Sequence, residues 1–282
     1  MKNASVLALS FLLAFGGCKQ SEKPQASRPL SIKGSDTMVI LTQRLAEEYM
    51  KRNAGRVVQV NGGGSGTGIA ALINGTVDLA QASRPMKDDE RAAAEKSRGA
   101  KIVETPAALD SLAVFVHQSN AVKELSLPQL ADIYTGKVRN WKDVGGKDAP
   151  IILYGRENSS GTYDYFKEHV LNKADFASAV QTLQGTAAIV NAVSRDANGI
   201  GYGGIAYDKG VRALALKKDA QSPAIAPSEA SVADGTYPLS RKLFFYSFAN
   251  SPERVTQFVQ WTLTPEAQAL VKAVGYFPLN TQ

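Results

Sequence analysis

The chain has little of what metal binding and acid–base catalysis usually require. Its 282 residues contain one cysteine, Cys18, and two histidines, His117 and His169. Metal sites gather such residues in clusters, and the sequence offers no such cluster. Few groups could exchange protons near neutral pH. We therefore expect no metal, no cofactor and no catalytic residue, with His117 in the core or hinge and His169 at the surface.

Long apolar runs and basic tracts are also missing. Beyond the N-terminus no stretch approaches the roughly 18 apolar residues that span a bilayer, so the body is expected to be soluble. Lys and Arg number 32 against 26 Asp and Glu, which gives a formal net charge of +6. These basic residues are interleaved with acids, as in Lys217-Lys218-Asp219, and a nucleic-acid partner is not predicted.

The first 18 residues are typical of a secretory signal that is cleaved. A positive start precedes an apolar stretch over residues 4–15, and Gly16-Gly17 supply small residues before Cys18. The segment resembles a bacterial lipoprotein signal, in which the cysteine becomes the lipidated first residue, although Phe15 stands where such signals usually carry Leu. An ordinary signal peptide with a chance cysteine is the alternative. Residues 19–28 read as a flexible tether, so we expect a periplasmic or cell-surface protein with a lipid anchor.

From Pro29 onward, short apolar runs alternate with helical patterns, which predicts an α/β fold with a mainly parallel sheet. Met38, Leu41, Leu45 and Tyr49 recur at the spacing of one helix face. Further helices are expected over 69–74 and 187–193, and an extended segment over 200–207. The expected strands cover residues 31–33, 56–60, 77–82, 112–117, 151–154 and 243–248.

Capping patterns mark several helix starts. Ser251 and Thr264 each stand before a proline at the first position of an expected C-terminal helix. Asp88-Asp89-Glu90 favour the positive end of another helix, and we read them as caps rather than ligands.

Three loops between a predicted strand and a predicted helix share one composition. They are Gly-Ser-Asp-Thr at 34–37, Gly-Gly-Gly-Ser-Gly-Thr-Gly at 62–68 and Arg-Glu-Asn-Ser-Ser-Gly-Thr at 156–162. The first N–H groups of a helix lack an intrahelical partner, and with the helix dipole they can hold an anion. Glycines let an anion approach the main chain, and hydroxyls such as those of Ser35 and Thr37 add donors. In an open α/β sheet such loops lie where ligands bind.

One such loop alone would be read as a helix cap, but three loops with Arg156 predict an oxyanion site, since arginine can offer two parallel N–H groups. An ion pair, for example with Glu157, is the alternative role for Arg156. Ser83, after the strand that follows the second loop, can donate or accept a hydrogen bond. An acceptor matters because phosphate keeps a proton near neutral pH whereas sulfate does not. Ser83 and Asp36 are both candidates for that acceptor.

Several motifs follow one another in a fixed order along residues 31–277. They are Gly-Ser-x-Thr at 34–37, the glycine-rich run at 62–78, Ala-Ser-Arg-Pro-Met at 82–86, Tyr-Thr-Gly at 134–136, Asn-Trp at 140–141, the Arg156 loop and Gly-Ile-Gly-Tyr at 199–202. This set is similar to that of the phosphate-binding proteins of bacterial phosphate ABC transporters. The resemblance implies the following ligand donors: Thr37, the backbone of Met38, Ser65, Arg156, Ser160, Gly161 and Thr162. Several members carry an aspartate where this chain has Ser83, and the adjacent Arg84 could be a second cation in the site.

The resemblance also implies a two-lobed fold of the periplasmic-binding-protein type II, in which each lobe is a mainly parallel sheet flanked by helices. Lobe I would comprise residues 29–108 and 240–282, and lobe II residues 109–239. Two crossing strands near 109–117 and 239–248 would form the hinge. A monomer would close on inorganic phosphate, and the transmembrane permease of a phosphate ABC transporter would read the closed state.

Two other readings differ in ligand or in class. Sulfate or molybdate could occupy the same kind of site, and a sensor or scavenger could use it without transport. A serine-dependent hydrolase is the enzyme alternative, but the elbow-like Gly63-Gly64-Ser65-Gly66-Thr67 lacks the final glycine of that motif. A phosphate-binding P-loop would need Lys-Ser or Lys-Thr where the sequence continues Ile69-Ala70.

Overall fold

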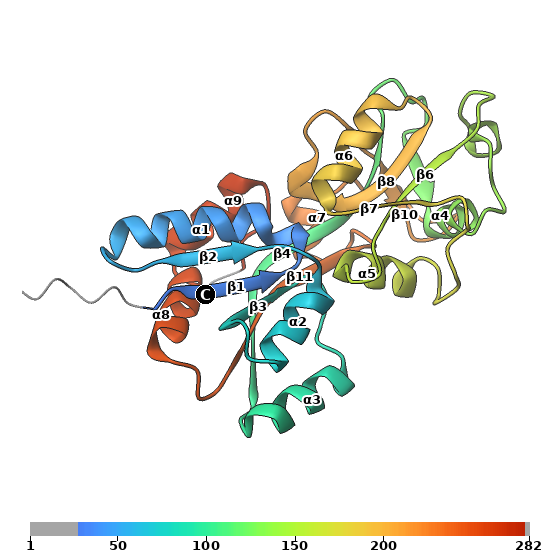
Figure 1. The fold of residues 1–282 in the computed structure, drawn as a ribbon. Coiled ribbons are helices and arrows are strands. Elements are labelled where there is room, and N and C mark those ends of the chain that lie inside the picture. Colours follow the sequence, from blue (N-terminus) through green and yellow to red (C-terminus); the bar gives the residue numbers. More distant parts are fainter. Residues whose placement is uncertain (1–27, 280–282) are drawn as a thin grey trace, which may run out of the picture.

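The computed structural model describes residues 28–279 (Figure 1). The signal segment, Cys18 and all but the last residue of the tether lie outside the described residues. As expected, the chain is a mixed α/β fold of two lobes joined by two strands. The main sheet has the strand order β2-β1-β3-β11-β4-β8-β6-β7 and runs through both lobes.

The first lobe is a sheet covered by helices on both faces. Its parallel strands are β1 (Leu30–Gly34), β2 (Val58–Asn61) and β3 (Leu79–Ala82), and β11 (Ser240–Phe248) pairs antiparallel with β3. Its helices are α1 (Val39–Arg52), α2 (Ser65–Ile73), α3 (Asp88–Arg98), α8 (Glu253–Thr262) and α9 (Pro265–Val274). Successive strand residues point to opposite faces. Leu79 and Phe245 accordingly pack with α1, α8 and α9, whereas Ala80 and Phe244 pack with α2 and α3.

Two strands connect the lobes. The long strand β4 (Ile102–Val116) pairs with β11 over residues 102–111, and from Leu112 to Val116 it pairs with β8 in the second lobe. The expected strand at 112–117 therefore covers only its second part, because the first part carries partly exposed polar residues such as Glu104. The lobe boundaries at 108/109 and 239/240 stay predictions.

The second lobe repeats the layered arrangement. Strand β6 (Ile152–Arg156) lies parallel to β7 (Gln181–Leu183) and β8 (Gly199–Gly204). A short β9 (Arg212–Ala213) adds to β4, and β5 (Glu124–Ser126) pairs with β10 (Ala215–Lys217). The helices are α4 (Leu127–Tyr134), α5 (Gly161–His169), α6 (Thr186–Arg195) and α7 (Glu229–Ala233), with 3₁₀ turns η2 (Trp141–Val144) and η3 (Ile205–Tyr207). The remaining 3₁₀ turn, η1 (Asp36–Met38), belongs to the first lobe, where it joins β1 to α1.

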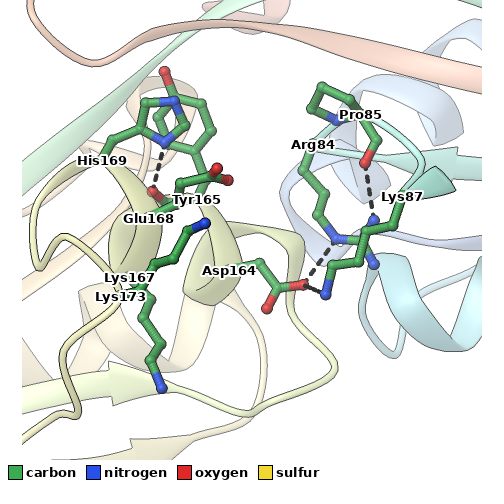
Figure 2. Close-up of a pocket in the computed structure, with 9 residues that line it drawn as sticks. All are labelled: Arg84, Pro85, Lys87, Asp164, Tyr165, Lys167, Glu168, His169 and Lys173. Atoms are coloured by element: carbon green, nitrogen blue, oxygen red, sulfur yellow. Dashed lines mark hydrogen bonds and ion pairs between the residues drawn. The ribbon is translucent and has the colours of Figure 1, made fainter. Parts of the chain in front are cut away.

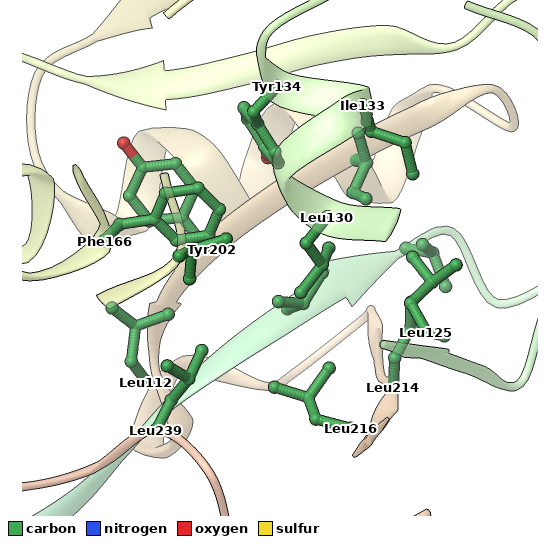
Figure 3. Packing of buried hydrophobic residues seen from close by; sticks show 14 of the residues in the cluster. Leu112, Leu125, Leu130, Ile133, Tyr134, Phe166, Tyr202, Leu214, Leu216 and Leu239 are labelled. Atoms are coloured by element: carbon green, nitrogen blue, oxygen red, sulfur yellow. The ribbon is translucent and has the colours of Figure 1, made fainter. Parts of the chain in front are cut away.

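The core of the second lobe is aliphatic at one end and aromatic at the other (Figure 3). Leu112 of β4 and Leu130 of α4 are fully buried there. The rings of Phe166 and Tyr202 stack with centroids 4.1 Å apart. Because Phe166 lies on α5 and Tyr202 on β8, this stack holds the helix that begins with the third loop against the sheet.

Several local predictions can be compared directly with the structure. Asp88-Asp89-Glu90 do lie in the first turn of α3, and Thr264 accepts a hydrogen bond from the N–H of Ala267 as the cap of α9. Ser251 was expected to cap α8 but does not, because its hydroxyl accepts from the N–H of Phe248. The extended segment expected over 200–207 ends at Gly204, since the next three residues form η3. His117 lies just beyond β4 and contacts Ser119, so its expected core or hinge position is wrong.

Candidate functional site

Four hydroxyl groups from both lobes meet at the interface between the lobes. The Oγ1 atoms of Thr37 and Thr162 are 2.9 Å apart, and Ser83 Oγ lies 3.4 Å from Thr162 Oγ1. Ser65 Oγ lies 3.4 Å from Ser83 Oγ and accepts a hydrogen bond from the Ser83 N–H. All four side chains are buried. We refer to Thr37, Ser65, Ser83 and Thr162 as the hydroxyl cluster.

The topology of the sheet explains this meeting. Thr37 follows β1, Ser65 follows β2 and Ser83 follows β3, and these parallel strands share one carboxyl edge. Thr162 follows β6 of the other lobe at the start of α5. The carboxyl edges of the two sheets therefore face each other across the interface, which is where ligands bind in open α/β sheets.

Two glycines allow the lobes to approach this closely. A Cβ on Gly161, at the first position of α5, would lie 2.3 Å from Ser65 Oγ and 2.9 Å from Ser83 Oγ. A Cβ on Gly64 would lie 2.4 Å from the Ser159 carbonyl oxygen, and Gly64 has φ +92°. Glycine is therefore required at position 161 because a side chain would collide with the other lobe. At position 64 it is required both by such a collision and by the positive φ.

Ser159 ties the two glycine-bearing loops together directly. Its carbonyl accepts a hydrogen bond of 2.9 Å from the N–H of Gly66, and its hydroxyl donates to the carbonyl of Gly63. These bonds run between the second loop and the third, so the structure represents the lobes in contact. Sequence reasoning missed Ser159, because a serine beside the capping Ser160 carries no signal of its own.

The other predicted donors have mixed roles. Ser160 caps α5, since its hydroxyl accepts from the N–H groups of Thr162 and Tyr163. The N–H of Met38 donates to the carbonyl of Ser35 within η1, and both residues are buried. The amide of Met38 would thus have to exchange this bond to reach a ligand.

Arg156 is buried beside the cluster and binds groups from both lobes. Its Nη2 donates to Asp36 Oδ2 at 3.1 Å and to Glu157, its Nε donates to Glu157, and its Nη1 donates to Thr186 Oγ1 at 2.9 Å. A guanidinium carries five N–H donors, so one N–H on Nη1 is left for a ligand. Burial opposes ionisation of Glu157, but the hydrogen bonds from Arg156 outweigh it and hold the pKa of Glu157 below its ordinary value. The ion pair weighed as an alternative for Arg156 does form.

Asp36 has both carboxylate oxygens occupied. Oδ1 accepts from the N–H of Gly63 at 2.9 Å, and Oδ2 accepts from Arg156. Asp36 therefore links the first loop to the second loop and to Arg156, so these contacts do not support it as a free acceptor for a ligand proton.

The guanidinium of Arg84 is paired with acids, so its contacts do not support the expectation that it adds a second cation to the hydroxyl cluster. Its Nε donates to Asp164 of α5 at 2.8 Å (Figure 2). Its Nη1 and Nη2 bind Glu90. Lys87 also pairs with Asp164. Burial opposes ionisation of Glu90, yet the hydrogen bond from Arg84 lowers its pKa. Arg84, Lys87 and Asp164 line a cavity of about 600 Å³ between the lobes, and their ion pairs cross the interface.

A buried ion pair supports the cluster from behind. Arg241 of β11 donates from Nε to Asp110 Oδ2 of β4 at 2.9 Å and from Nη1 to the carbonyl of Ser83. Burial raises the pKa of Asp110, and the charge of Arg241 only partly offsets this effect. The pair thus fixes Ser83 to both connecting strands. Sequence analysis did not identify this pair, because its two residues lie 131 positions apart.

Residues 28–279 contain no helix long and apolar enough to cross a membrane. The same range contains no group of three or more His, Cys, Asp or Glu side chains placed to hold a metal ion.

Comparison with known proteins identifies the family. The chain matches the PBP superfamily domain over residues 19–266. It is 38% identical to phosphate-binding protein PstS of Pseudomonas aeruginosa over 267 residues, which cover 89% of this chain and 83% of that protein. A structure from Clostridium perfringens, solved with bound phosphate and named for a phosphate ABC transporter substrate-binding protein, matches with a TM-score of 0.82. It is 30% identical and covers 90% of this chain with its whole length.

An ABC-type phosphate transport receptor from Vibrio cholerae matches with a TM-score of 0.72 at 28% identity, and its whole length covers 89% of this chain. These neighbours share the two-lobed architecture expected from the sequence, so the fold is that of a type II periplasmic binding protein. The match spans most of the chain in both the sequence and the structure comparisons. The chain therefore belongs to the PBP superfamily and, within it, to the family of phosphate-binding proteins of bacterial phosphate ABC transporters.

Proposed function

We propose that this chain captures inorganic phosphate between its two lobes and presents it to the permease of a phosphate ABC transporter. The observation that carries this proposal is the hydroxyl cluster, in which buried donors from both lobes lie within hydrogen-bonding distance of one another. The family of the chain supports the same ligand.

The cluster suits a small tetrahedral anion. Hydroxyls can rotate to donate, and phosphate oxygens accept several hydrogen bonds each. Thr37, Ser65, Ser83 and Thr162 would exchange their mutual contacts for bonds to phosphate, while the remaining N–H on Arg156 Nη1 would add a charged donor. Hydrogen bonds to a charged partner are stronger than those between neutral groups, so this exchange favours the anion.

Binding and closure are coupled in this proposal. The donors come from both lobes, so only the closed form offers all of them to one ligand, and phosphate shifts the population toward that form. The permease would recognise the closed form and release the ligand by opening it. A single chain is sufficient for this cycle, and we propose that the protein acts as a monomer and has no enzymatic activity.

Sulfate is the second candidate ligand, because position 83 carries a serine where several members of the family carry an aspartate that accepts the proton of phosphate. Asp36 is the other candidate acceptor, but both of its carboxylate oxygens already accept hydrogen bonds. Ser83 would then be the acceptor for the proton of phosphate. Titration calorimetry with phosphate and with sulfate, at a pH on each side of the second phosphate pKa, separates the two. Tighter binding of sulfate than of phosphate would reject phosphate as the ligand.

We further propose an extracytoplasmic protein held at a membrane by lipid on Cys18, with residues 19–28 as the tether. The signal-like N-terminus supports this proposal. Replacing Cys18 by Ala should release the protein from the membrane fraction. A Cys18→Ala chain that stays membrane-bound argues against the anchor and leaves the phosphate site untouched.

A further inference from the structure

A second cavity lies at the end of the first lobe opposite the hydroxyl cluster. Its volume is about 410 Å³, and its lining includes Arg28, Gly75, Asp78, Arg98, Phe248 and Arg254. Arg28 and Asp78 precede β1 and β3, whereas the hydroxyl cluster follows the carboxyl ends of these strands. The two sites are therefore separated by the length of the sheet (Figure 1). We call Arg28, Arg98 and Arg254 with their surroundings the arginine cavity.

The charges that line this cavity are unbalanced. Asp78 is the only acidic residue in the lining, and it is fully used: Oδ1 accepts from Arg254 at 2.6 Å and Oδ2 accepts from the N–H of Ser31. Neither Arg28 nor Arg98 has an ion pair within residues 28–279. The Nε of Arg254 is buried and has no hydrogen-bond partner in the same range. Two positive charges and a buried donor therefore remain for a ligand.

Arg98 is held in position by apolar contact rather than by an acid. Its guanidinium carbon lies 5.8 Å from the ring centroid of Phe248. A Cβ on Gly75 would lie only 2.4 Å from Arg98 Nη2, so the guanidinium packs against the main chain at Gly75. Stacking on a ring restrains the plane of an arginine but uses none of its N–H groups. The donors of Arg98 are thus oriented without being neutralised.

We propose that the arginine cavity is a second anion site, which takes the phosphate group of a phosphate ester. Guanidinium groups match phosphate oxygens with paired N–H bonds. The volume falls within the range of small-ligand pockets, so the site accommodates more than a bare anion. It uses none of the residues of the hydroxyl cluster and needs no closure of the lobes.

Two sources can supply this chemistry. One is the head group of an anionic membrane lipid, because Arg28 follows Cys18 by ten positions and an extended tether of this length spans at most about 35 Å. The other is a soluble phosphate ester. The shared requirement is a phosphate group with at least one ester-linked substituent.

The test uses the chain from residue 19 onward, which omits the signal and the lipid. The Clostridium perfringens and Vibrio cholerae structures cover 90% and 89% of this chain with their whole lengths, so bodies of this extent fold without that segment. One arm measures co-sedimentation with phosphatidylglycerol vesicles, with phosphatidylcholine vesicles as the reference. The other arm measures calorimetric binding of sn-glycerol 3-phosphate. Binding in the first arm alone identifies the lipid source, and binding in the second identifies the soluble one.

The variants are Arg98→Gln and Arg28→Gln, each compared with Arg195→Gln. Arg195 is an exposed residue at the end of α6 in the other lobe. Its replacement by Gln removes one positive charge, as the two test variants do, but far from the arginine cavity. We expect Arg98→Gln to weaken binding about tenfold or more, the effect of losing one charge-assisted hydrogen bond. Arg28→Gln should act in the same direction. Because Arg28 is exposed, a loss of binding in Arg28→Gln cannot be attributed to unfolding. Two results would overturn the proposal. One is the absence of binding in both arms, with neither co-sedimentation above the phosphatidylcholine reference nor calorimetric binding of sn-glycerol 3-phosphate. The other is a loss in both variants no larger than that in Arg195→Gln.

Discussion

Replacing Gly161 by Ala should block phosphate capture without unfolding the protein. The added methyl group would lie 2.3 Å from Ser65 Oγ across the lobe interface. About 1 Å of separation is needed before these atoms reach an ordinary carbon–oxygen contact of about 3.5 Å. The contact between Thr37 and Thr162, now 2.9 Å, would open to a similar extent and leave hydrogen-bonding range.

The size of the effect follows from the bonds that are lost. A hydrogen bond to a charged partner contributes about 1.5–3 kcal/mol, so the loss of two bonds to phosphate costs about 3 kcal/mol or more. The dissociation constant should therefore rise at least about 100-fold. Helical alanine is favoured over glycine by about 1 kcal/mol, and Gly161 is not among the residues with positive φ, so the second lobe should not lose stability.

Titration calorimetry with phosphate and thermal unfolding without it measure the two halves of this prediction. Gly66→Ala is the matched control, because it lies at the same interface and its Cβ would be 3.4 Å from the nearest atom, the Ser159 carbonyl oxygen. The control should bind almost as tightly as the parent chain. If Gly161→Ala binds phosphate normally, or if both variants lose affinity equally, the ligand does not lie between these two loops.

Three further predictions concern charged groups. Arg156→Ala should weaken phosphate binding by about 2–5 kcal/mol, because the site loses its cation and because Asp36 and Glu157 lose a shared partner. An unchanged calorimetric affinity would place Arg156 outside the site. Asp164→Asn removes a carboxylate that pairs with Arg84 and Lys87. It should weaken phosphate binding by no more than about 1 kcal/mol, since this carboxylate is partly exposed and its charge is screened. A loss of affinity as large as that of Arg156→Ala would contradict this expectation. The lowered pKa of Glu157 means that its contribution to folding is present above the unfolded-state pKa near 4 and is lost as the pH falls through the lower folded-state pKa. Thermal unfolding midpoints below pH 4 should therefore fall less steeply in Glu157→Gln than in the parent chain, and equal slopes would show that Glu157 is not responsible.

The sequence predicted the meeting of the loops because one rule decides it. Parallel strands share a carboxyl edge, so residues after β1, β2 and β3 must lie together wherever those strands form. Thr37 and Ser65 could therefore be placed beside Ser83 without coordinates. The strand periodicity that identified those segments depends only on neighbours along the chain.

The role of Arg84 could not be derived in this way. Ser83 and Arg84 lie in a bend after β3, where the alternation of a strand no longer decides which way a side chain points. The partner of Arg84, Asp164, lies 80 positions away in the other lobe, and nothing in the local pattern indicates which acid a guanidinium will find. The pairing of Asp110 with Arg241 spans 131 positions and was missed for the same reason.

The contacts between the lobes indicate what controls closure. The ion pairs of Arg84 with Asp164 and of Arg156 with Asp36 each join a buried guanidinium to a carboxylate that keeps 17–25% of its side-chain exposure. In such pairs the cost of removing the charges from water offsets most of their attraction. Moving a two-state equilibrium from 1:99 to 99:1 requires about 5.5 kcal/mol, which these pairs alone do not provide. Four hydrogen bonds from the hydroxyl cluster to an anion, at about 1.5–3 kcal/mol each, do provide it. Closure should therefore follow occupancy of the cluster rather than the ion pairs around it, which is why a methyl group at Gly161 is expected to matter more than the charge of Asp164.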